Sequence, residues 1–119
     1  MSYIDGFVAP VREEKKQAYL DMAAKAAPIF REYGALRVVE GWGNDLPHGK
    51  TTDFFLAVKA EDGENVVFSW IVWPDKATRD AGWEKVMADE RMKPEGDMPF
   101  DGKRMFWGGF DPIVDEGEG

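Results

Sequence analysis

The side chains in this chain that could do chemistry are polar residues placed inside apolar stretches. Three stand out: Asp5 in YIDGFV, Ser69 in VVFSWIVW and Arg104 in KRMFWGGF. A carboxylate buried in a strand must be paired, hydrogen-bonded or protonated. Asp5 is therefore half of a structural ion pair, with Arg104 as its expected partner, or a general base or ligand anchor with a shifted pKa, unless one or both residues are exposed. These three residues are the candidate catalytic groups.

Aromatic residues are the second resource for a binding site. The chain has eight Phe, three Tyr and five Trp, and large aromatics dominate both cores and interfaces. Most of them are expected to fill the core, and others to line a dimer interface or a pocket. Tyr3, Trp70 and Trp107 are the candidate ligand contacts. Because Ser69 and Trp70 project from opposite faces of one strand, whichever faces the helices can touch a ligand.

Several kinds of catalytic site lack their residues or their spacing. The chain has no cysteine, which excludes disulfides, thiolate metal sites and a cysteine nucleophile. Its single histidine, His48, lies in the turn-like LPHGK, whereas a metal site needs several converging ligands. Ser69 and His48 are formally two parts of a Ser–His–Asp arrangement, but no nucleophile elbow supports it. No phosphate loop or dinucleotide fingerprint is present, so we expect neither a metal nor a cofactor.

Charge and hydropathy restrict the partners. The net charge is −8, and the basic footprint that binds a phosphate backbone is missing, so nucleic acid is not an expected partner. No apolar run approaches the roughly 20 residues of a membrane span, and the N-terminal residues do not resemble a signal peptide. We therefore expect a cytoplasmic protein that does not contact a membrane.

The elements that must position these residues alternate along the chain. Strands are predicted at 3–11, 35–43, 66–73 and 103–110, helices at 13–33 and 76–88, and a short helix, less distinct from a strand, at 53–60. The resulting order, β-α-β-β-α-β, predicts an α+β, ferredoxin-like fold: a four-stranded antiparallel sheet with two helices on one face. One domain is expected over 1–114, followed by a disordered acidic tail at 115–119.

The strand 66–73 is apolar on both faces, which is informative about assembly. Two helices cover only one face of the sheet, and an exposed apolar patch usually marks an interface. Two sheets placed face to face would bury it, which predicts a homodimer forming a dimeric α+β barrel. In the strand 35–43, Arg37 and Glu40 project from opposite faces, and at least one of them is interpreted as a charge that blunts a sheet edge.

The stretch FDGKRMFWGGF (100–110) combines aromatics, cations and glycines and is interpreted first as a structural element, a turn followed by a strand. Asp101-Gly102 is the sequence of a tight turn, and RMFWGGF alternates like a strand. Gly108 and Gly109 mark a place where that strand bends or is closely approached. No helix follows, so a phosphate cradle is disfavoured, while a pocket wall remains open.

In its blocks YIDGFV, APIFREYGALRVVE, VVFSWIVWPDKATRD and ERMKPEGDMPFDGKRMFWGGF, the chain resembles the YbaA-like family of uncharacterised bacterial proteins. The resemblance implies a dimeric α+β barrel and supplies no activity or catalytic residue. The wider barrel superfamily is similar to small cofactor-free monooxygenases, muconolactone isomerases and, in elaborated forms, haem enzymes, many with a pocket between helices and sheet. That likeness is one of fold, which does not fix function.

Three functions remain open. The first is a small homodimer that binds a modest, largely apolar molecule in the cleft between helices and sheet. The second is a cofactor-independent enzyme of the monooxygenase or isomerase kind that uses Asp5, Ser69 or Arg104. The third is an interaction protein without a small-molecule site, which meets its partner through the acidic surface.

Overall fold

The structure is a computed structural model that describes residues 2–94 and 96–117. Its strands are β1 (Tyr3–Arg12), β2 (Arg37–Trp42), β3 (Glu64–Trp73) and β4 (Phe106–Phe110). Its α-helices are α1 (Lys16–Glu32), α2 (Phe54–Ala57) and α3 (Lys76–Ala88), with short 3-10 turns η1 (Glu13–Lys15) and η2 (Glu90–Met92). The predicted order of elements, including a helix within 53–60, is confirmed.

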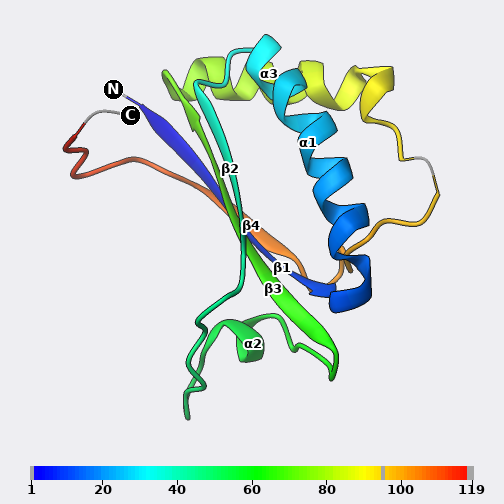
Figure 1. Ribbon diagram of the computed structural model, residues 1–119. Coiled ribbons are helices and arrows are strands. Elements are labelled where there is room, and N and C mark those ends of the chain that lie inside the picture. The colour runs from blue at the N-terminus through cyan, green and yellow to red at the C-terminus, as the bar shows by residue number, and fades with distance from the viewer. Residues whose placement is uncertain (1, 95, 118–119) are drawn as a thin grey trace.

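The four strands form one antiparallel sheet in the order β2-β3-β1-β4. This is the predicted ferredoxin-like arrangement, with the N-terminal strand in the interior and β2 and β4 at the edges. Helices α1 and α3 lie together on one side of the sheet (Figure 1). Helix α3 begins where its sequence indicates, because the Asp75 carboxylate accepts a hydrogen bond from the Thr78 amide at 2.7 Å.

The main core lies between this pair of helices and the sheet. Because side chains alternate across a strand, residues two apart on β1 and β3 face the helices together. The buried cluster there contains Tyr3, Ile29, Phe30, Ala35, Ile71, Trp73 and Val86. Trp73 and Val86 are completely buried, so α3 is held against β3 by tightly packed side chains.

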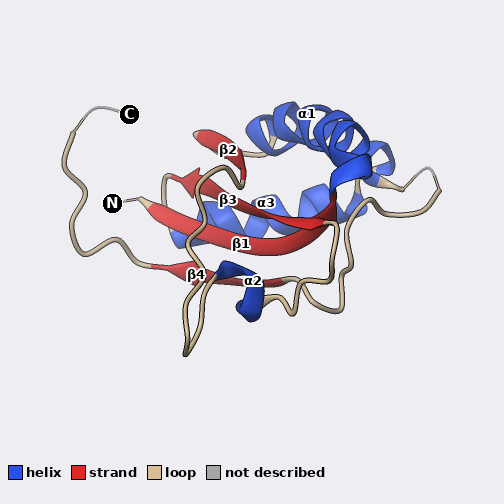
Figure 2. Ribbon diagram, turned by 60° about the horizontal axis from the view of Figure 1, so that its bottom comes forward, coloured by secondary structure: helices blue, strands red, loops and turns tan. Residues whose placement is uncertain are grey.

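The second face of the sheet is covered at one end only. Figure 2 shows α1 on one side of the strands and α2 on the other. The α2 region packs on this face through a cluster of Val8, Val58 and Val66, with Leu46 and Phe55 beside them. Elsewhere on the face, large apolar side chains stay exposed: Phe68 by 45%, Phe106 by 47% and Phe110 by 60%. We call this surface the open face.

The stretch 100–110 is turn followed by strand, with a later strand start than predicted. Residues 102–104 form the turn, the Asp101 carboxylate accepts from the Lys103 amide at 2.9 Å, and β4 begins only at Phe106. Gly109 is closely approached, as predicted: a side chain there would collide with the ring of Tyr3. Glycine is therefore required at this position by the packing of β1 against β4.

Beyond β4 the chain contains no helix or strand through residue 117. Residues 118 and 119 of the predicted tail 115–119 lie outside the described residues. The Ser2 hydroxyl donates a 3.0 Å hydrogen bond to Asp115, so the C-terminal segment contacts the start of the chain. In the described part of the chain, no helix combines the length and hydropathy needed to cross a membrane.

Candidate functional site

Asp5 is completely buried and fully hydrogen-bonded. Its carboxylate accepts from the indole N–H groups of Trp73 (2.9 Å) and Trp83 (2.8 Å). It also accepts from Arg79 of α3, through Nε at 3.0 Å and Nη2 at 2.7 Å. These donors compensate the burial of its charge, and they join β1, β3 and α3 through one group.

The partner of Asp5 is therefore Arg79, and the predicted pairing with Arg104 is wrong. The Arg79 guanidinium lies over the rings of Tyr3, at 5.1 Å, and Trp107, at 5.9 Å. Its hydrogen bonds to Asp5 raise the Arg79 pKa above its ordinary value. The Asp5 carboxylate is buried and accepts hydrogen bonds from these donors, as the structural alternative for this residue predicts.

Arg104 lies in the turn before β4 rather than in the strand, and it binds a different set of groups. It holds Glu64 through two hydrogen bonds of 2.6 and 2.8 Å and Asp101 through one of 2.8 Å. It also donates to the Lys59 carbonyl at 3.1 Å. A hollow of about 210 Å³ adjoins it, lined also by Pro10, Arg12 and Phe100. Arg104 thus anchors the segment before β4 to β3.

Ser69 belongs to a row of four side chains that crosses the helix-facing side of the sheet. In the strand register Glu40 lies opposite Ser69, Ser69 opposite Phe7, and Phe7 opposite Trp107. The row therefore contains a carboxyl, a hydroxyl and two aromatic rings, at spacings of about 4.8 Å between neighbouring strands. We call these four residues the cross-sheet row.

The carboxyl end of the row is paired with a phenol. The Tyr19 hydroxyl of α1 donates to Glu40 Oε1 at 2.6 Å, and the buried Ser69 hydroxyl hydrogen-bonds with the same two groups. Loss of hydration raises the pKa of the Glu40 carboxyl. Burial, together with the nearby Glu40 charge, raises the pKa of the Tyr19 phenol as well. The pair is thus a proton donor and acceptor in direct contact.

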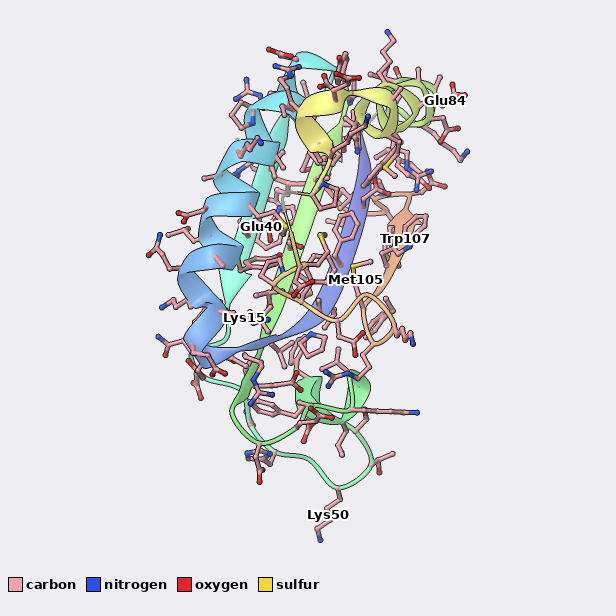
Figure 3. All side chains as sticks on the ribbon, turned by 90° about the vertical axis from the view of Figure 1, so that its right-hand side faces the viewer. Lys15, Glu40, Lys50, Glu84, Met105 and Trp107 are labelled. Atoms are coloured by element: carbon pink, nitrogen blue, oxygen red, sulfur yellow. The ribbon has the colours of Figure 1, made fainter. Side chains whose placement is uncertain are left out.

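The aromatic end of the row continues into α3. Phe7 contacts Trp83, with ring centroids 6.0 Å apart, and Trp107, at 6.5 Å. Both ends remain accessible, because Glu40 is exposed and Trp107 is 57% exposed. Figure 3 looks onto this side and shows Glu40 beside α1 and Trp107 on β4 at the opposite edge.

The three candidate ligand contacts lie in three different settings. Tyr3 is buried in the main core, and Trp107 stands at the aromatic end of the cross-sheet row. Trp70 faces the opposite side, where it lines a hollow of about 180 Å³. Because Ser69 is its neighbour in the strand, Ser69 is the one of the two that faces the helices. Of the six candidate site residues, only Ser69 and Trp107 share the row.

Metal-ligating groups do not converge in the described part of the chain. No three His, Cys, Asp or Glu side chains among the described residues gather closely enough to hold an ion. His48 is an exposed loop residue that stacks on Phe55 at 4.9 Å and lies 3.8 Å from Asp53. The hydroxyl of Ser69 contacts Tyr19 and Glu40 instead, so its partners differ from those of a Ser–His–Asp arrangement.

Tyr19 was not among the predicted site residues, and Glu40 was considered only, together with Arg37, as a charge that blunts a sheet edge. Strand β2 is an edge strand as expected, but Glu40 points to its helix-facing side, where α1 contacts it. One signal was available: Glu40 alternates with Val38 and Trp42, which places a carboxyl on the apolar side of the strand. Its phenol partner, 21 residues away, depends on how α1 crosses the sheet.

The fold defines an α+β protein of ferredoxin-like topology with a carboxyl–phenol pair on the helix-facing side of its sheet. The chain belongs to the family described as "Protein of unknown function (DUF1428)", which matches residues 2–102. It is 62% identical over 117 residues to the "Uncharacterized protein YbaA" of Escherichia coli and to that of Shigella flexneri. Those matches cover 98% of this chain and 100% of each relative.

Solved structures share the fold at low sequence identity. A putative antibiotic biosynthesis monooxygenase from Bacillus cereus has a TM-score of 0.58 at 10% identity, covering 98% of this chain and 96% of its own. An uncharacterised NIPSNAP domain protein from Burkholderia xenovorans scores 0.56 at 15% identity, with 98% and 99% covered. SnoaB, a cofactor-independent oxygenase from Streptomyces nogalater, scores 0.50 at 12% identity, with 98% of each chain covered. At such identities the likeness concerns the fold.

Proposed function

We propose that this protein binds a compact, largely apolar molecule along the cross-sheet row and that Glu40 moves a proton to or from it. The observation that carries the proposal is the Glu40–Tyr19 pair: an accessible carboxyl, hydrogen-bonded at 2.6 Å to a phenol, on the helix-facing side of the sheet. Phe7 and Trp107 in the same row contact each other, and the exposed ring of Trp107 offers an apolar surface to the ligand.

The acid–base role follows from the electrostatics of the pair. A general base works better when its pKa is raised from the ordinary carboxyl value, and loss of hydration raises the pKa of Glu40. Ionised Glu40 accepts a proton from an acidic C–H or O–H group of the ligand. The Tyr19 hydroxyl, hydrogen-bonded to the same carboxyl, stabilises the ionised form that is present before the first proton transfer and after the second.

The fold comparisons are compatible with this chemistry. One of the similar structures is SnoaB, a cofactor-independent oxygenase, and another is a putative antibiotic biosynthesis monooxygenase. Removing a proton from a substrate is a step that side chains perform without a cofactor. We therefore favour a cofactor-independent enzyme of the isomerase or oxygenase kind over a carrier that only binds.

Binding is tested by native mass spectrometry of freshly purified protein. We expect a reproducible extra mass on the wild type, and its loss in Trp107→Ala, which removes the aromatic end of the row. Glu84→Gln on α3 is the matched control, because Glu84 is exposed and lies in a different element. A mass retained by Trp107→Ala, or a clean wild-type protein after gentle purification, contradicts the proposed binding site.

Proton transfer is tested on the molecule so identified, by incubation in heavy water. Wild-type protein is expected to exchange one ligand proton for deuterium, seen as a mass increase in the extracted molecule. Glu40→Gln is expected to bind the molecule and lose the exchange at least 100-fold, a typical contribution of a general base. Equal exchange by the Gln variant rules out the acid–base role and leaves binding as the function.

We further propose that the protein is a homodimer joined through the open face. Support comes from the exposed apolar side chains there, because soluble monomers rarely leave such side chains contiguous. Phe68 contacts Trp70 at 5.7 Å between ring centroids, and Phe106 and Phe110 follow on β4. Helix α2 covers one end of the face, and a second sheet is the simplest cover for the rest.

The homodimer is tested by sedimentation velocity. Wild-type protein is expected to sediment as a dimer, and Phe68→Glu as a monomer, because the new charge would be buried at the interface. Leu20→Glu on α1 is the control, since Leu20 is 55% exposed on the helical side. A wild-type monomer, or a Phe68→Glu protein as dimeric as the control, contradicts the proposal.

A further inference from the structure

We infer that residues Asp111–Val114, here called the C-terminal arm, cross to a second copy of this chain and place Ile113 in the hollow on that copy's open face. The inference rests on the proposed homodimer and goes beyond it, because it names a segment, its docking site and the symmetry of the assembly. Three observations carry it: the exposure of the arm, the position of the hollow, and the distance between them in one chain.

The arm is apolar at its tip, and no described part of its own chain covers that tip. Ile113 is 96% exposed and Val114 is 80% exposed, the largest fractions among the exposed large hydrophobic residues of the described chain. In Figure 1 the segment after β4 leaves the sheet on the side away from α1 and α3. The Ser2–Asp115 hydrogen bond holds the residue that follows the arm against the start of the chain. The arm is therefore held at both ends, and its tip projects from the molecule.

The hollow on the open face suits an aliphatic side chain. It has a volume of about 180 Å³, and its lining includes Leu46, Phe54, Val66, Phe68 and Trp70. It lies between the C-terminal end of β2 and the α2 region. On β3 it is lined by Val66, near the start of the strand, and by Phe68 and Trp70. This volume is below that of usual small-molecule pockets and fits a single branched side chain better than a ligand.

Ile113 cannot reach this hollow within its own chain. Phe110 pairs with Ile4 of β1, and Ile4 pairs with Val72, at the opposite end of β3 from Val66. Six residues along β3 and two to three strand spacings across give a separation of roughly 20 Å or more. The three residues from Phe110 to Ile113 span at most about 10 Å. Only another copy can supply the side chain.

Symmetry makes the exchange reciprocal. The arm leaves one corner of the open face, and the hollow lies at the diagonally opposite corner. Consider two sheets that face each other, with a two-fold axis lying in the plane midway between them and perpendicular to that diagonal. Rotation about this axis brings each arm opposite the hollow of the other copy. Such an interface is isologous, so both contacts form together, and the strands of the two sheets cross steeply.

The test uses cysteines, because the natural chain contains none. A tagged Ile113→Cys protein is mixed with an untagged Leu46→Cys protein, allowed to exchange subunits, and treated with a short thiol-reactive cross-linker. We expect a cross-linked band of tagged plus untagged mass. The control replaces Leu46→Cys with Met87→Cys, whose side chain is 74% exposed on α3 and lies away from the open face.

Sedimentation velocity on the same proteins separates the possible failures. A dimer with strong 113–46 cross-linking and little with the α3 control supports the inference. A dimer that cross-links no more at 46 than at 87 overturns the arm exchange and leaves the homodimer standing. A monomer under all conditions overturns both. The double substitution Ile113→Ser and Val114→Ser is expected to weaken dimerisation at least tenfold, and unchanged dimerisation would also contradict the inference.

Discussion

The Tyr19 hydroxyl of α1 donates a 2.6 Å hydrogen bond to the Glu40 carboxyl of β2. This contact joins a helix to an edge strand and places a proton donor and acceptor at one end of the cross-sheet row. Because Glu40 is also exposed, the pair is accessible from outside the core. The buried Asp5–Arg79 pair, by contrast, is enclosed by two tryptophans and stabilises the fold.

Glu40 is expected to make stability depend on pH in a defined direction. Its pKa is raised in the folded chain, so the unfolded chain releases this proton first, at its ordinary pKa of about 4.3. Stability from this group is complete below that pH and is lost as pH rises through the folded pKa. Glu40→Gln should therefore gain stability relative to wild type between pH 4 and pH 7, by less than about 1 kcal/mol because Glu40 is partly exposed.

Urea unfolding of both proteins at several pH values measures this difference. Glu84→Gln, an exposed change on α3, should show no such trend. The free energy of unfolding of Glu40→Gln minus that of wild type should grow with rising pH. If this difference stays constant, or grows toward acid pH, the ionised form of Glu40 is not destabilised in the folded chain.

Asp5→Asn is expected to be strongly destabilising. The substitution removes the charge that compensates Arg79, whose side chain is only 13% exposed, and it weakens the acceptors of two indole N–H groups. Breaking a buried pair in this way costs about 3–5 kcal/mol. The measurement is urea unfolding followed by tryptophan fluorescence, with Asp80→Asn as the exposed control partner of Arg79. If Asp5→Asn and Asp80→Asn lower the free energy of unfolding equally, the buried Asp5–Arg79 pair is not an important source of stability.

Arg104→Met is expected to destabilise most near neutral pH. Hydrogen bonding from Arg104 lowers the pKa of Glu64, so this pair contributes stability above the ordinary Glu pKa and loses it as pH falls through the folded value. In the variant, Glu64, 4% exposed, is left ionised without its partner at pH 7, at a cost of about 3 kcal/mol.

The loss in Arg104→Met should shrink as Glu64 becomes protonated, which unfolding curves at pH 7 and pH 4 would reveal. Arg12→Met is the matched control, because its pair with Glu14 is exposed and is worth less than about 1 kcal/mol. A loss that is as large at pH 4 as at pH 7 would indicate a packing role for Arg104 rather than an electrostatic one.

Gly82→Ala is expected to destabilise α3 although alanine favours helices. A Cβ at this position would lie 2.5 Å from the Trp73 ring and 2.8 Å from the Tyr33 carbonyl oxygen. Trp73 is completely buried and cannot move aside, so overpacking should cost about 1–3 kcal/mol. Thermal unfolding measures the loss, and the exposed Ala81→Gly in the same helix should cost about 0.5–1 kcal/mol. A more stable Gly82→Ala protein would contradict this packing.

The cross-sheet row was only partly predictable. Ser69 and Trp107 were candidates because they lie in apolar strands, but their common face depends on the register of β1 with β3 and β4. A shift of one residue would reverse the face of a strand. Tyr19 gave no signal of its own, because an apolar stripe on a helix indicates a core face and does not indicate which strand the stripe meets.

Local patterns in the sequence by themselves determined the order of strands and helices, and with it the ferredoxin-like fold. These patterns are the alternation of side chains in the strands, the helix cap at Asp75 and the turn at Asp101. Each depends on residues that are close in sequence, so it can be predicted from the sequence. Only the tertiary structure decided the partners of charged groups. Asp5 pairs with Arg79, 74 residues away, rather than with Arg104, because α3 lies across β1 and carries its guanidinium to the buried carboxylate. Long side chains can be paired in many ways along a sequence, and packing selects one.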